Sequence, residues 1–283
     1  MFAAFCRILE MNITADTKII PIFGNPISHS LSPLIQNTWL KEEKINCVYV
    51  AFRVENKDLK KAIDAVRIFS MPGANVTVPH KTAIMKYLDE IDKSAVKIGS
   101  INTIVNRNGK LTGYNTDWNG FFEDLKENKI NIKNKTAVVV GAGGGSKAVL
   151  YALSYGGIKK IIIASKTYKT AKVISKKYKT AQAVEIDKMN GFDFSNADII
   201  INASTCGMNP SDILPFKITN FKKTLAIYDL IYGKETPFKK FASANNLKYV
   251  SGLGMLVRQG AFGFKMWTGK KPDIKIASEL IKK

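Results

Sequence analysis

Four short clusters of polar side chains fall where predicted strands end in the first half of the chain. They occupy residues 28–33, 75–81, 100–103 and 113–117. Ligands of α/β proteins bind beyond the carboxyl ends of the sheet strands, so side chains at such positions can meet around one small molecule. The clusters supply hydroxyl, amide and carboxylate groups together with a lysine ammonium group. We therefore expect a site for a polar ligand, with acid–base chemistry within its reach.

Lys81 is the candidate for proton transfer. It follows Pro79, which we expect to start a helix, and a lysine in a first turn lies beside the positive end of the helix dipole. That placement disfavours the ammonium form and eases the loss of its proton. A solvated lysine is the plainer interpretation. In the same way, Ser32 and Asp117 are plausible helix N-caps, and Asn102 could satisfy backbone groups.

A glycine-rich turn follows the β-branched run 138–140 and precedes a segment of helical period. The turn consists of Gly141, Ala142, Gly143, Gly144 and Gly145. In a strand–turn–helix arrangement, glycines let backbone N–H groups approach a pyrophosphate at the start of the helix. Ser146 stands where the strict dinucleotide fingerprint has its third glycine. We predict a dinucleotide-binding loop, with a tight turn that holds no ligand as the alternative.

The end of the next predicted strand, residues 161–165, indicates which dinucleotide binds. Enzymes that use NAD usually place an acidic residue there, which binds the ribose 2′-hydroxyl. This chain has Ser165, Lys166, Thr167 and Lys169 and no acidic residue in that stretch. Hydroxyl and ammonium groups would bind a 2′-phosphate that a carboxylate would repel. The sequence therefore predicts NADP, although these lysines could be merely solvated.

Short β-branched runs alternate with segments of helical period along most of the chain, which predicts an α/β fold with mostly parallel sheets. Strands are expected at residues 18–23, 47–52, 74–78, 102–105, 110–114, 136–140 and 161–165. Helices are expected at residues 32–43, 58–69, from 79, 118–128 and 255–268. Asn108-Gly109 predicts a tight hairpin turn, and the second half is expected to alternate strand and helix through Tyr228. The polar segment 131–135 is a candidate domain boundary.

Composition limits the class of protein. The 283 residues are 46% hydrophobic and 23% charged, which excludes an intrinsically disordered chain. No apolar run reaches the roughly 18 residues of a membrane-spanning helix. The net charge of +20 could indicate a nucleic acid or an anionic membrane surface, but the lysines are spread along the chain, which favours solvated surface positions. A denser basic group at residues 159–179 could lie beside a phosphate-bearing ligand.

Cysteine and histidine usage excludes two further classes. Cys6, Cys47 and Cys206 give no disulfide framework, and a reducing cytoplasm is the expected location. With only His29 and His80 beside them, the chain has no ligand set for structural zinc, and we expect no metal. Residues 1–10 make a poor secretory signal and are expected to carry no function, since regular patterning begins only near residue 18 and Met11 could be the natural start.

Seven stretches, taken together and in order, resemble the shikimate dehydrogenase family. They are residues 24–33, 75–81, 115–117 with 120–121, 141–146, 202–208, 228–232 with 236–238, and 252–259. The resemblance covers residues of about 20 to 267 and is far more specific than the glycine turn alone. It implies a substrate-binding catalytic domain at residues 11–117 and a Rossmann-like NADP-binding domain at 118–254. Helices at 255–283 would return to the substrate domain.

The resemblance also implies the activity. It is the reversible, NADP-dependent reduction of 3-dehydroshikimate to shikimate in the shikimate pathway of aromatic amino acid biosynthesis. A relative that acts on quinate as well, with NAD or NADP, is the nearest alternative, and a basic nucleic-acid-binding protein is an alternative of another class. The expected partner is a small-molecule substrate, with no nucleic acid and no membrane. The expected protein is a cytoplasmic monomer or homodimer.

Roles for single residues come from the resemblance. Lys81 and Asp117 would form the catalytic pair. Substrate would be bound by Ser30, Ser32, Thr77, Lys81, Asn102, Asp117, Tyr232 and Gln259. NADP would be bound by Gly141, Ala142, Gly143, Gly144, Gly145, Ser165, Lys166, Thr167, Lys169, Leu230 and Gly252. Lys166 replaces the arginine common in the family, which predicts weaker recognition of the 2′-phosphate. Cys206 is expected to be a small packing residue.

Overall fold

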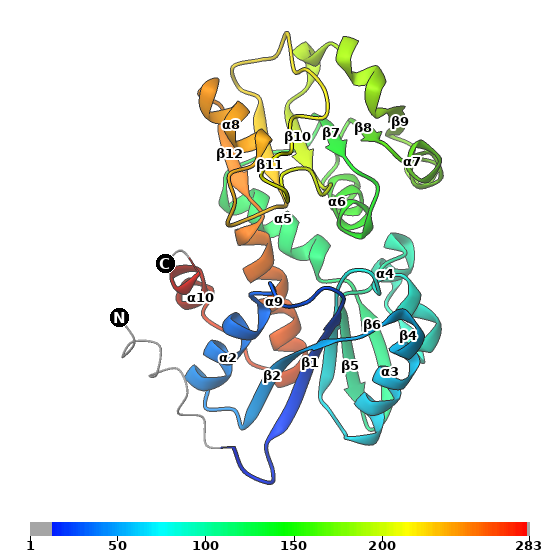
Figure 1. Cartoon of the computed structure of the whole chain (residues 1–283), viewed down its shortest axis with the longest axis vertical. Coiled ribbons are helices and arrows are strands. Elements are labelled where there is room, and N and C mark those ends of the chain that lie inside the picture. The colour runs from blue at the N-terminus through cyan, green and yellow to red at the C-terminus, as the bar shows by residue number, and fades with distance from the viewer. Residues whose placement is uncertain (1–12, 282–283) are drawn as a thin grey trace. The chain divides into compact units, whose positions relative to one another are not determined.

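The computed structural model describes residues 13–281 and divides into two compact units (Figure 1). The first unit takes the chain up to Thr116 and again from Val257, and the second is Asp117–Leu256. Residues 1–10, which we expect to carry no function, and Cys6 among them lie outside the described residues. Each unit is built on its own six-stranded sheet.

The sheet of the first unit has the strand order β2-β1-β3-β5-β6-β4. Its strands are β1 (Lys18–Gly24), β2 (Cys47–Arg53), β3 (Gly73–Val76), β4 (Glu90–Ile91), β5 (Thr103–Arg107) and β6 (Lys110–Tyr114). Only β5 runs antiparallel to its neighbours, β3 and β6. The hairpin predicted at Asn108-Gly109 is confirmed, because both residues have positive φ (54° and 88°), as a type I′ turn requires.

Helices cover both faces of this sheet (Figure 1). They are α2 (Ser32–Glu42), η1 (Asn56–Asp58), α3 (Leu59–Ile68), η2 (Ala83–Tyr87), α4 (Lys93–Ile98) and α10 (Ile274–Leu280), with the C-terminal part of α9 (Leu253–Thr268). α3 buries Ile63 and Val66 in a cluster with strand residues such as Val76. On the other face, the ring of Trp39 meets that of Phe264 at 5.8 Å. Both faces of the sheet are therefore covered by packed helices, and the rigid strands can hold side chains in place at the edge of the sheet.

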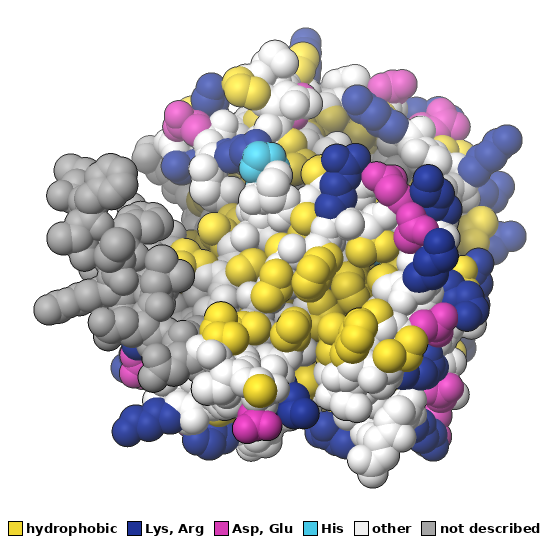
Figure 2. Space-filling model, turned by 60° about the horizontal axis from the view of Figure 1, so that its bottom comes forward, with side chains coloured by type: hydrophobic (Ala, Val, Ile, Leu, Met, Phe, Trp, Pro, Cys, Tyr) yellow, Lys and Arg dark blue, Asp and Glu magenta, His cyan; other side chains and the backbone are white. Residues whose placement is uncertain are grey.

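Figure 2 shows hydrophobic side chains gathered across one face, with lysine and arginine around them and acidic residues among the basic ones. Large hydrophobic residues exposed on the first unit include Ile68 (73%) and Phe69 (67%) at the end of α3, and Phe52 (41%) on the edge strand β2. The nucleic-acid alternative predicts one dense positive face. On the face in Figure 2, the basic side chains are instead dispersed.

The sheet of the second unit is parallel throughout, in the order β12-β11-β10-β7-β8-β9. Its strands are β7 (Thr136–Val140), β8 (Lys160–Ser165), β9 (Ala181–Glu185), β10 (Ile199–Asn202), β11 (Ala226–Asp229) and β12 (Lys248–Ser251). Its helices are α5 (Asp117–Glu127), α6 (Gly144–Tyr155), α7 (Tyr168–Ser175), α8 (Pro237–Ala244) and the start of α9. The chain leaves β7 at the centre of the sheet, which is the doubly wound arrangement of dinucleotide-binding domains. The predicted α/β fold with mostly parallel sheets is confirmed.

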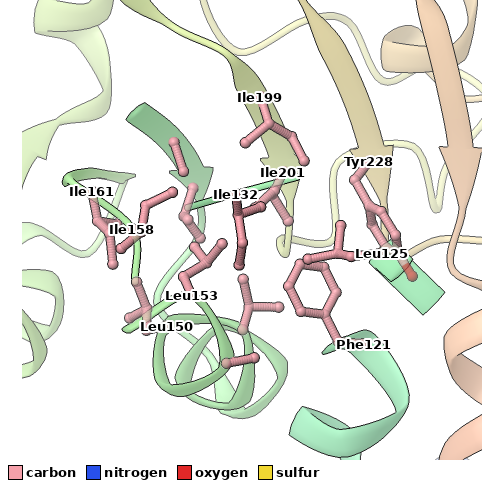
Figure 3. Packing of buried hydrophobic residues seen from close by; sticks show 14 of the residues in the cluster. Phe121, Leu125, Ile132, Leu150, Leu153, Ile158, Ile161, Ile199, Ile201 and Tyr228 are labelled. Carbon is pink, nitrogen blue, oxygen red and sulfur yellow. The ribbon is translucent and has the colours of Figure 1, made fainter. Parts of the chain in front are cut away.

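The polar segment 131–135 is not the boundary between the units. α5 lies before that segment, yet its Phe121 and Leu125 are buried in one cluster with Ile132 and Tyr228 of the second unit (Figure 3). The rings of Phe121 and Tyr228 lie 4.8 Å apart. Because this apolar face needs the second core, the units divide at Thr116.

The expected strand–helix alternation fails between β9 and β11. Only two short 3₁₀ helices, η3 (Ile186–Gly191) and η4 (Phe194–Asn196), precede β10, and the segment from β10 to β11 is irregular in the described chain. η4 buries Phe194, which stacks on Phe216 of that irregular segment. Aromatic packing here covers the sheet in place of helices.

The prediction of a helix that starts at Pro79 is also wrong. Residues 78–82 form turns, and a five-residue 3₁₀ helix, η2, follows them. The N–H of Met85 bonds the carbonyl of Thr82, three residues back, so the chain winds more tightly than an α-helix. The helix-dipole argument for Lys81 therefore does not apply.

Two expected N-caps are wrong as well. α2 begins at Ser32, so its N-cap is Leu31, and the Ser30 hydroxyl accepts the Ser32 N–H at 3.3 Å. α5 begins at Asp117, which lies inside its first turn.

Candidate active site

Asn102 is the centre of a buried polar network in the first unit. Its side chain is at the start of β5, which runs antiparallel and so begins at the edge where β3 and β6 end. The Asn102 amide donates to the Thr116 hydroxyl and to the Gln259 side-chain oxygen, both at 2.9 Å. Its oxygen accepts the Thr116 N–H at 2.7 Å. The bond between Asn102 and Gln259 brings together two residues 157 positions apart that we expect to bind substrate.

Asn75 and Tyr49 extend this network; the sequence places Asn75 in the polar cluster 75–81 without a role of its own, and it gives no signal for Tyr49. The Asn75 amide donates to the Asn102 carbonyl at 2.8 Å, and the Tyr49 hydroxyl donates to the Asn75 oxygen at 2.5 Å. Burial raises the pKa of Tyr49 well above its usual value, while a hydrogen bond with the Ser32 side chain acts in the opposite direction. Ser32 is therefore joined to the Asn102 network through Tyr49.

The turn that carries Lys81 is held through its backbone. The Ile101 N–H donates to the Lys81 carbonyl at 2.8 Å, so this turn lies beside the start of β5. His80 is fully buried, and its Nε2 donates to the Val54 carbonyl at 2.8 Å. The Thr77 N–H bonds the Phe23 carbonyl at the end of β1. The half-buried Lys81 side chain thus projects from a turn fixed on both sides.

Two further candidate residues, Asp117 and Tyr232, belong to the second unit. Asp117 is the first residue of α5 and is 5% exposed. Tyr232 is half-buried, and burial raises the pKa of its hydroxyl.

The glycine turn fits a pyrophosphate. Gly141 has φ of 106°, and a Cβ there would lie 2.7 Å from the Ala203 carbonyl oxygen, so only glycine fits. Gly143, in contrast, faces open space within the described chain, where a ligand can approach the first turn of α6. Ser146 is buried and donates its hydroxyl to the Gly141 carbonyl at 2.7 Å. A serine in place of the third glycine is therefore accommodated with its hydroxyl hydrogen-bonded.

The segment after β8 presents the groups expected for a 2′-phosphate. The Ser165 hydroxyl accepts the Thr167 N–H at 3.1 Å, and Lys166 and Lys169 are exposed. Sequence reasoning missed Asp212, which comes from the segment after β10. The Gly207 and Asn209 N–H groups lower its pKa, and the charge of Lys166 adds to that effect. A carboxylate therefore faces the positive potential of this lysine.

Leu230 joins the glycine turn to the start of α9. A Cβ on Gly145 would lie 3.1 Å from the Leu230 side chain, and one on Gly252 would lie 2.2 Å from the Leu230 carbonyl oxygen. Three expected cofactor residues are thus in contact. Cys206 donates its thiol to the Ile213 carbonyl at 3.2 Å and packs against a hydrophobic cluster, and burial raises its pKa. Its contacts match the expected packing role.

Residues 13–281 contain no group of three or more histidine, cysteine, aspartate or glutamate side chains that could hold a metal ion. In the same range, no helix is long and apolar enough to cross a membrane.

One unit has a parallel sheet with a glycine turn after its central strand, and the other is an α/β unit with a buried polar network; a chain with both is a two-domain nicotinamide-dinucleotide oxidoreductase. Three family models match the chain: the shikimate dehydrogenase substrate binding domain at residues 22–104, shikimate / quinate 5-dehydrogenase at 124–211, and the shikimate 5′-dehydrogenase C-terminal domain at 252–281. The chain belongs to the shikimate dehydrogenase family, so the resemblance seen in the sequence is confirmed.

Relatives match over nearly the whole chain. A protein of Caldanaerobacter subterraneus subsp. tengcongensis named shikimate dehydrogenase (NADP(+)) is 40% identical and covers 96% of this chain and 99% of its own. One of Methanocaldococcus jannaschii with the same name is 42% identical, with 95% and 98% covered. The solved structure of the Aquifex aeolicus shikimate dehydrogenase has a TM-score of 0.89 at 35% identity and covers 96% of this chain and all of its own.

Proposed function

We propose that this protein reversibly reduces 3-dehydroshikimate to shikimate with NADPH, as a step of the shikimate pathway. The observation that carries the proposal is the buried Asn102–Thr116–Gln259 network, which lies at the strand edge of a unit matched by a substrate-binding domain of this family. Relatives named shikimate dehydrogenase (NADP(+)) over nearly their full length support the substrate and the cofactor.

Substrate binding is assigned to hydroxyl and amide groups that suit a polyhydroxylated ring acid. The residues are Ser30, Ser32, Thr77, Asn102, Tyr232 and Gln259. Asn102 and Gln259 are already oriented by their mutual bond, so they lose little conformational entropy when a ligand binds. Ser32 is steadied by Tyr49 in the same way.

Proton transfer is assigned to Lys81 and Asp117. When bound, NADPH supplies the hydride that reduces the ketone carbon. The oxygen of that ketone must then gain a proton, and the Lys81 ammonium group stabilises its developing charge and delivers the proton. The Asp117 carboxylate would accept a hydrogen bond from a substrate hydroxyl. The fixed turn around Lys81 holds the donor in place.

NADP binding is assigned to the second unit. The glycine turn, residues 141–145, would hold the pyrophosphate at the start of α6, and Leu230 with Gly252 would border the nicotinamide. Ser165, Lys166, Thr167 and Lys169 would bind the 2′-phosphate with hydroxyl and ammonium groups. Lys166 lacks the planar guanidinium group of arginine and faces Asp212, so a looser preference for NADP over NAD is the second candidate.

The location and assembly follow as proposals. A cytoplasmic enzyme fits the free thiols of Cys47 and Cys206, the two cysteines within the described residues. A monomer or a homodimer is proposed.

The experiment that tests this function is the consumption of NADPH with 3-dehydroshikimate, followed by chromatographic identification of the product. Shikimate formed in equal amount to the NADPH consumed is expected. NADPH consumption without shikimate, or no consumption by folded protein, would contradict the proposed reaction.

A further inference from the structure

Two neighbouring strands of the second unit end on polar residues that the proposed function leaves without a role. Asn202 ends β10 and Asp229 ends β11, and the two are direct partners in the parallel register. Both side chains are fully buried, as is that of Thr236, the N-cap of α8. Three buried polar groups at the carboxyl edge of a dinucleotide-binding sheet require an explanation.

Hydrogen bonds connect the three residues. The Asn202 amide donates to Asp229 Oδ1 at 2.8 Å, and the Thr236 hydroxyl donates to Asp229 Oδ2 at 2.5 Å. The Ile231 N–H donates to Oδ1 at 3.0 Å. Burial raises the pKa of the Asp229 carboxyl, and the three hydrogen bonds, whose donors are all neutral, oppose this rise only in part. The carboxylate is thus held by directed hydrogen bonds, which depend strongly on geometry.

The same residues hold the two loops that follow β10 and β11. Asn202 binds the Cys206 carbonyl at 2.8 Å and accepts the Ser204 hydroxyl at 2.7 Å. Thr236 accepts the Lys239 N–H at 3.1 Å, and its side chain lies against Gly207. The network therefore sets the course of residues 203–208 and 230–236 together.

Both loops touch the glycine turn. The Leu230 N–H donates to the Asn202 carbonyl at 2.9 Å, and the Leu230 side chain lies against Gly145. Ala203 follows Asn202 directly, and its carbonyl lies against Gly141. A shift of the network would therefore move the walls of the turn assigned to the pyrophosphate.

We propose that Asn202, Asp229 and Thr236 are positioning residues that set the affinity for the nicotinamide dinucleotide by fixing Leu230 and Ala203 against the glycine turn. The inference rests on the proposed function for the identity of that dinucleotide. None of the three residues needs to touch the ligand, because they act through Leu230 and the backbone of the 203–208 loop.

Asp198 provides a matched control at the opposite edge of the same sheet. It precedes β10, and its Oδ2 accepts the Thr136 N–H at 2.9 Å at the amino end of β7. Its Oδ1 accepts a hydrogen bond from the Lys222 ammonium group at 3.0 Å, and the change to asparagine removes the negative charge of this ion pair. That loss should weaken the sheet without moving the glycine turn. Asp198→Asn therefore separates an effect on stability from an effect on ligand position.

The test measures NADPH binding by the fluorescence of its nicotinamide, together with the thermal midpoint of the free protein. Thr236→Val keeps the shape of the side chain and removes its hydroxyl, which leaves Asp229 one donor short. We expect this variant to raise the Kd for NADPH by about tenfold at 25 °C. Thr236→Ser keeps the hydroxyl and should stay within about twofold of the wild type, as should Asp198→Asn.

The outcomes are distinct. If Thr236→Val lowers the thermal midpoint as Asp198→Asn does while its Kd for NADPH stays within about twofold of wild type, the role is structural only and the inference is overturned. A Thr236→Ser protein as weak as Thr236→Val would overturn the role of the hydroxyl. A folded wild-type protein that binds no NADPH would overturn the proposed function and, with it, this inference.

Discussion

Gly254 lies in the first turn of α9, where a methyl group has no room. An ideal Cβ at this position would lie 2.0 Å from Asp124 Oδ1 and 2.6 Å from the Asp124 Cγ. Asp124 is 1% exposed, and its Oδ2 accepts the Tyr228 hydroxyl at 2.7 Å. The positive dipole end of α9 is a second partner of this carboxylate, because it stabilises a negative charge. We therefore expect Gly254→Ala to force the carboxylate away from both partners.

The magnitude follows from two contributions. Overpacking a filled site costs about 1–3 kcal/mol. Weakening a hydrogen bond to a charged group costs about 1.5–3 kcal/mol. A combined loss of about 3 kcal/mol in the free energy of unfolding lowers the thermal midpoint of a protein of this size by roughly 6–12 °C. Circular dichroism during heating measures this shift.

A double-mutant cycle tests the cause. In an Asp124→Ala background the obstructing carboxylate is gone, so Gly254→Ala should cost less than about 1 kcal/mol, which gives a coupling energy of about 2 kcal/mol. Tyr228→Phe, which removes only the hydroxyl, serves as the control for the hydrogen bond. Equal costs of Gly254→Ala in the wild-type and Asp124→Ala backgrounds would refute the reasoning, because the carboxylate would then not be what the glycine accommodates.

Three further predictions concern the catalytic lysine, the cofactor loop and acid stability. Lys81→Ala should lower kcat by about 10²–10⁴-fold while shikimate binding weakens much less, and an unchanged kcat in steady-state kinetics would remove Lys81 from the mechanism. Lys166→Asp should raise the KM for NADP⁺ and shift the preference toward NAD⁺, because a carboxylate repels the 2′-phosphate; a KM for NADP⁺ equal to that of the wild type would show the loop to be misassigned. The Leu111 N–H and Arg67 lower the pKa of Asp89, so its contribution to stability is present above the unfolded pKa of about 3.9 and is lost as pH falls through the lower folded value. Urea unfolding should accordingly show Asp89→Asn destabilised at pH 6 but nearly equal to wild type at pH 2, and a difference that does not change with pH would contradict this.

Local signals in the sequence are sufficient to predict those elements whose backbone conformation requires a particular type of residue. Asn108-Gly109 adopts the positive φ values that make its hairpin turn predictable. The glycine turn is recognisable for the same reason, since Gly141 needs both positive φ and close approach to Ala203. The sequence also shows that Ser146 departs from the glycine of the dinucleotide fingerprint, but it does not show the hydrogen bond from Ser146 to the Gly141 carbonyl.

Contacts that depend on tertiary register were not predictable in this way. Asn75 meets Tyr49 and Asn102 only because β1 lies between β2 and β3 and because β5 runs antiparallel. The Asn202–Asp229 pair likewise arises from the alignment of β10 and β11. The prediction of a helix at Lys81 rests on a local signal, Pro79. The turn is instead held by the hydrogen bond from His80 to the Val54 carbonyl, and these two residues are 26 positions apart in sequence.

The rate of absorbance increase at 340 nm, measured with shikimate or quinate and with NADP⁺ or NAD⁺ in all four combinations, tests the central claim most directly. The proposed function predicts fast reduction with shikimate and NADP⁺ and much slower reduction in the other three combinations. Faster turnover with quinate or with NAD⁺ would contradict the assigned substrate or the assigned 2′-phosphate loop. No turnover in any combination by folded protein would contradict the assignment as a dehydrogenase of shikimate.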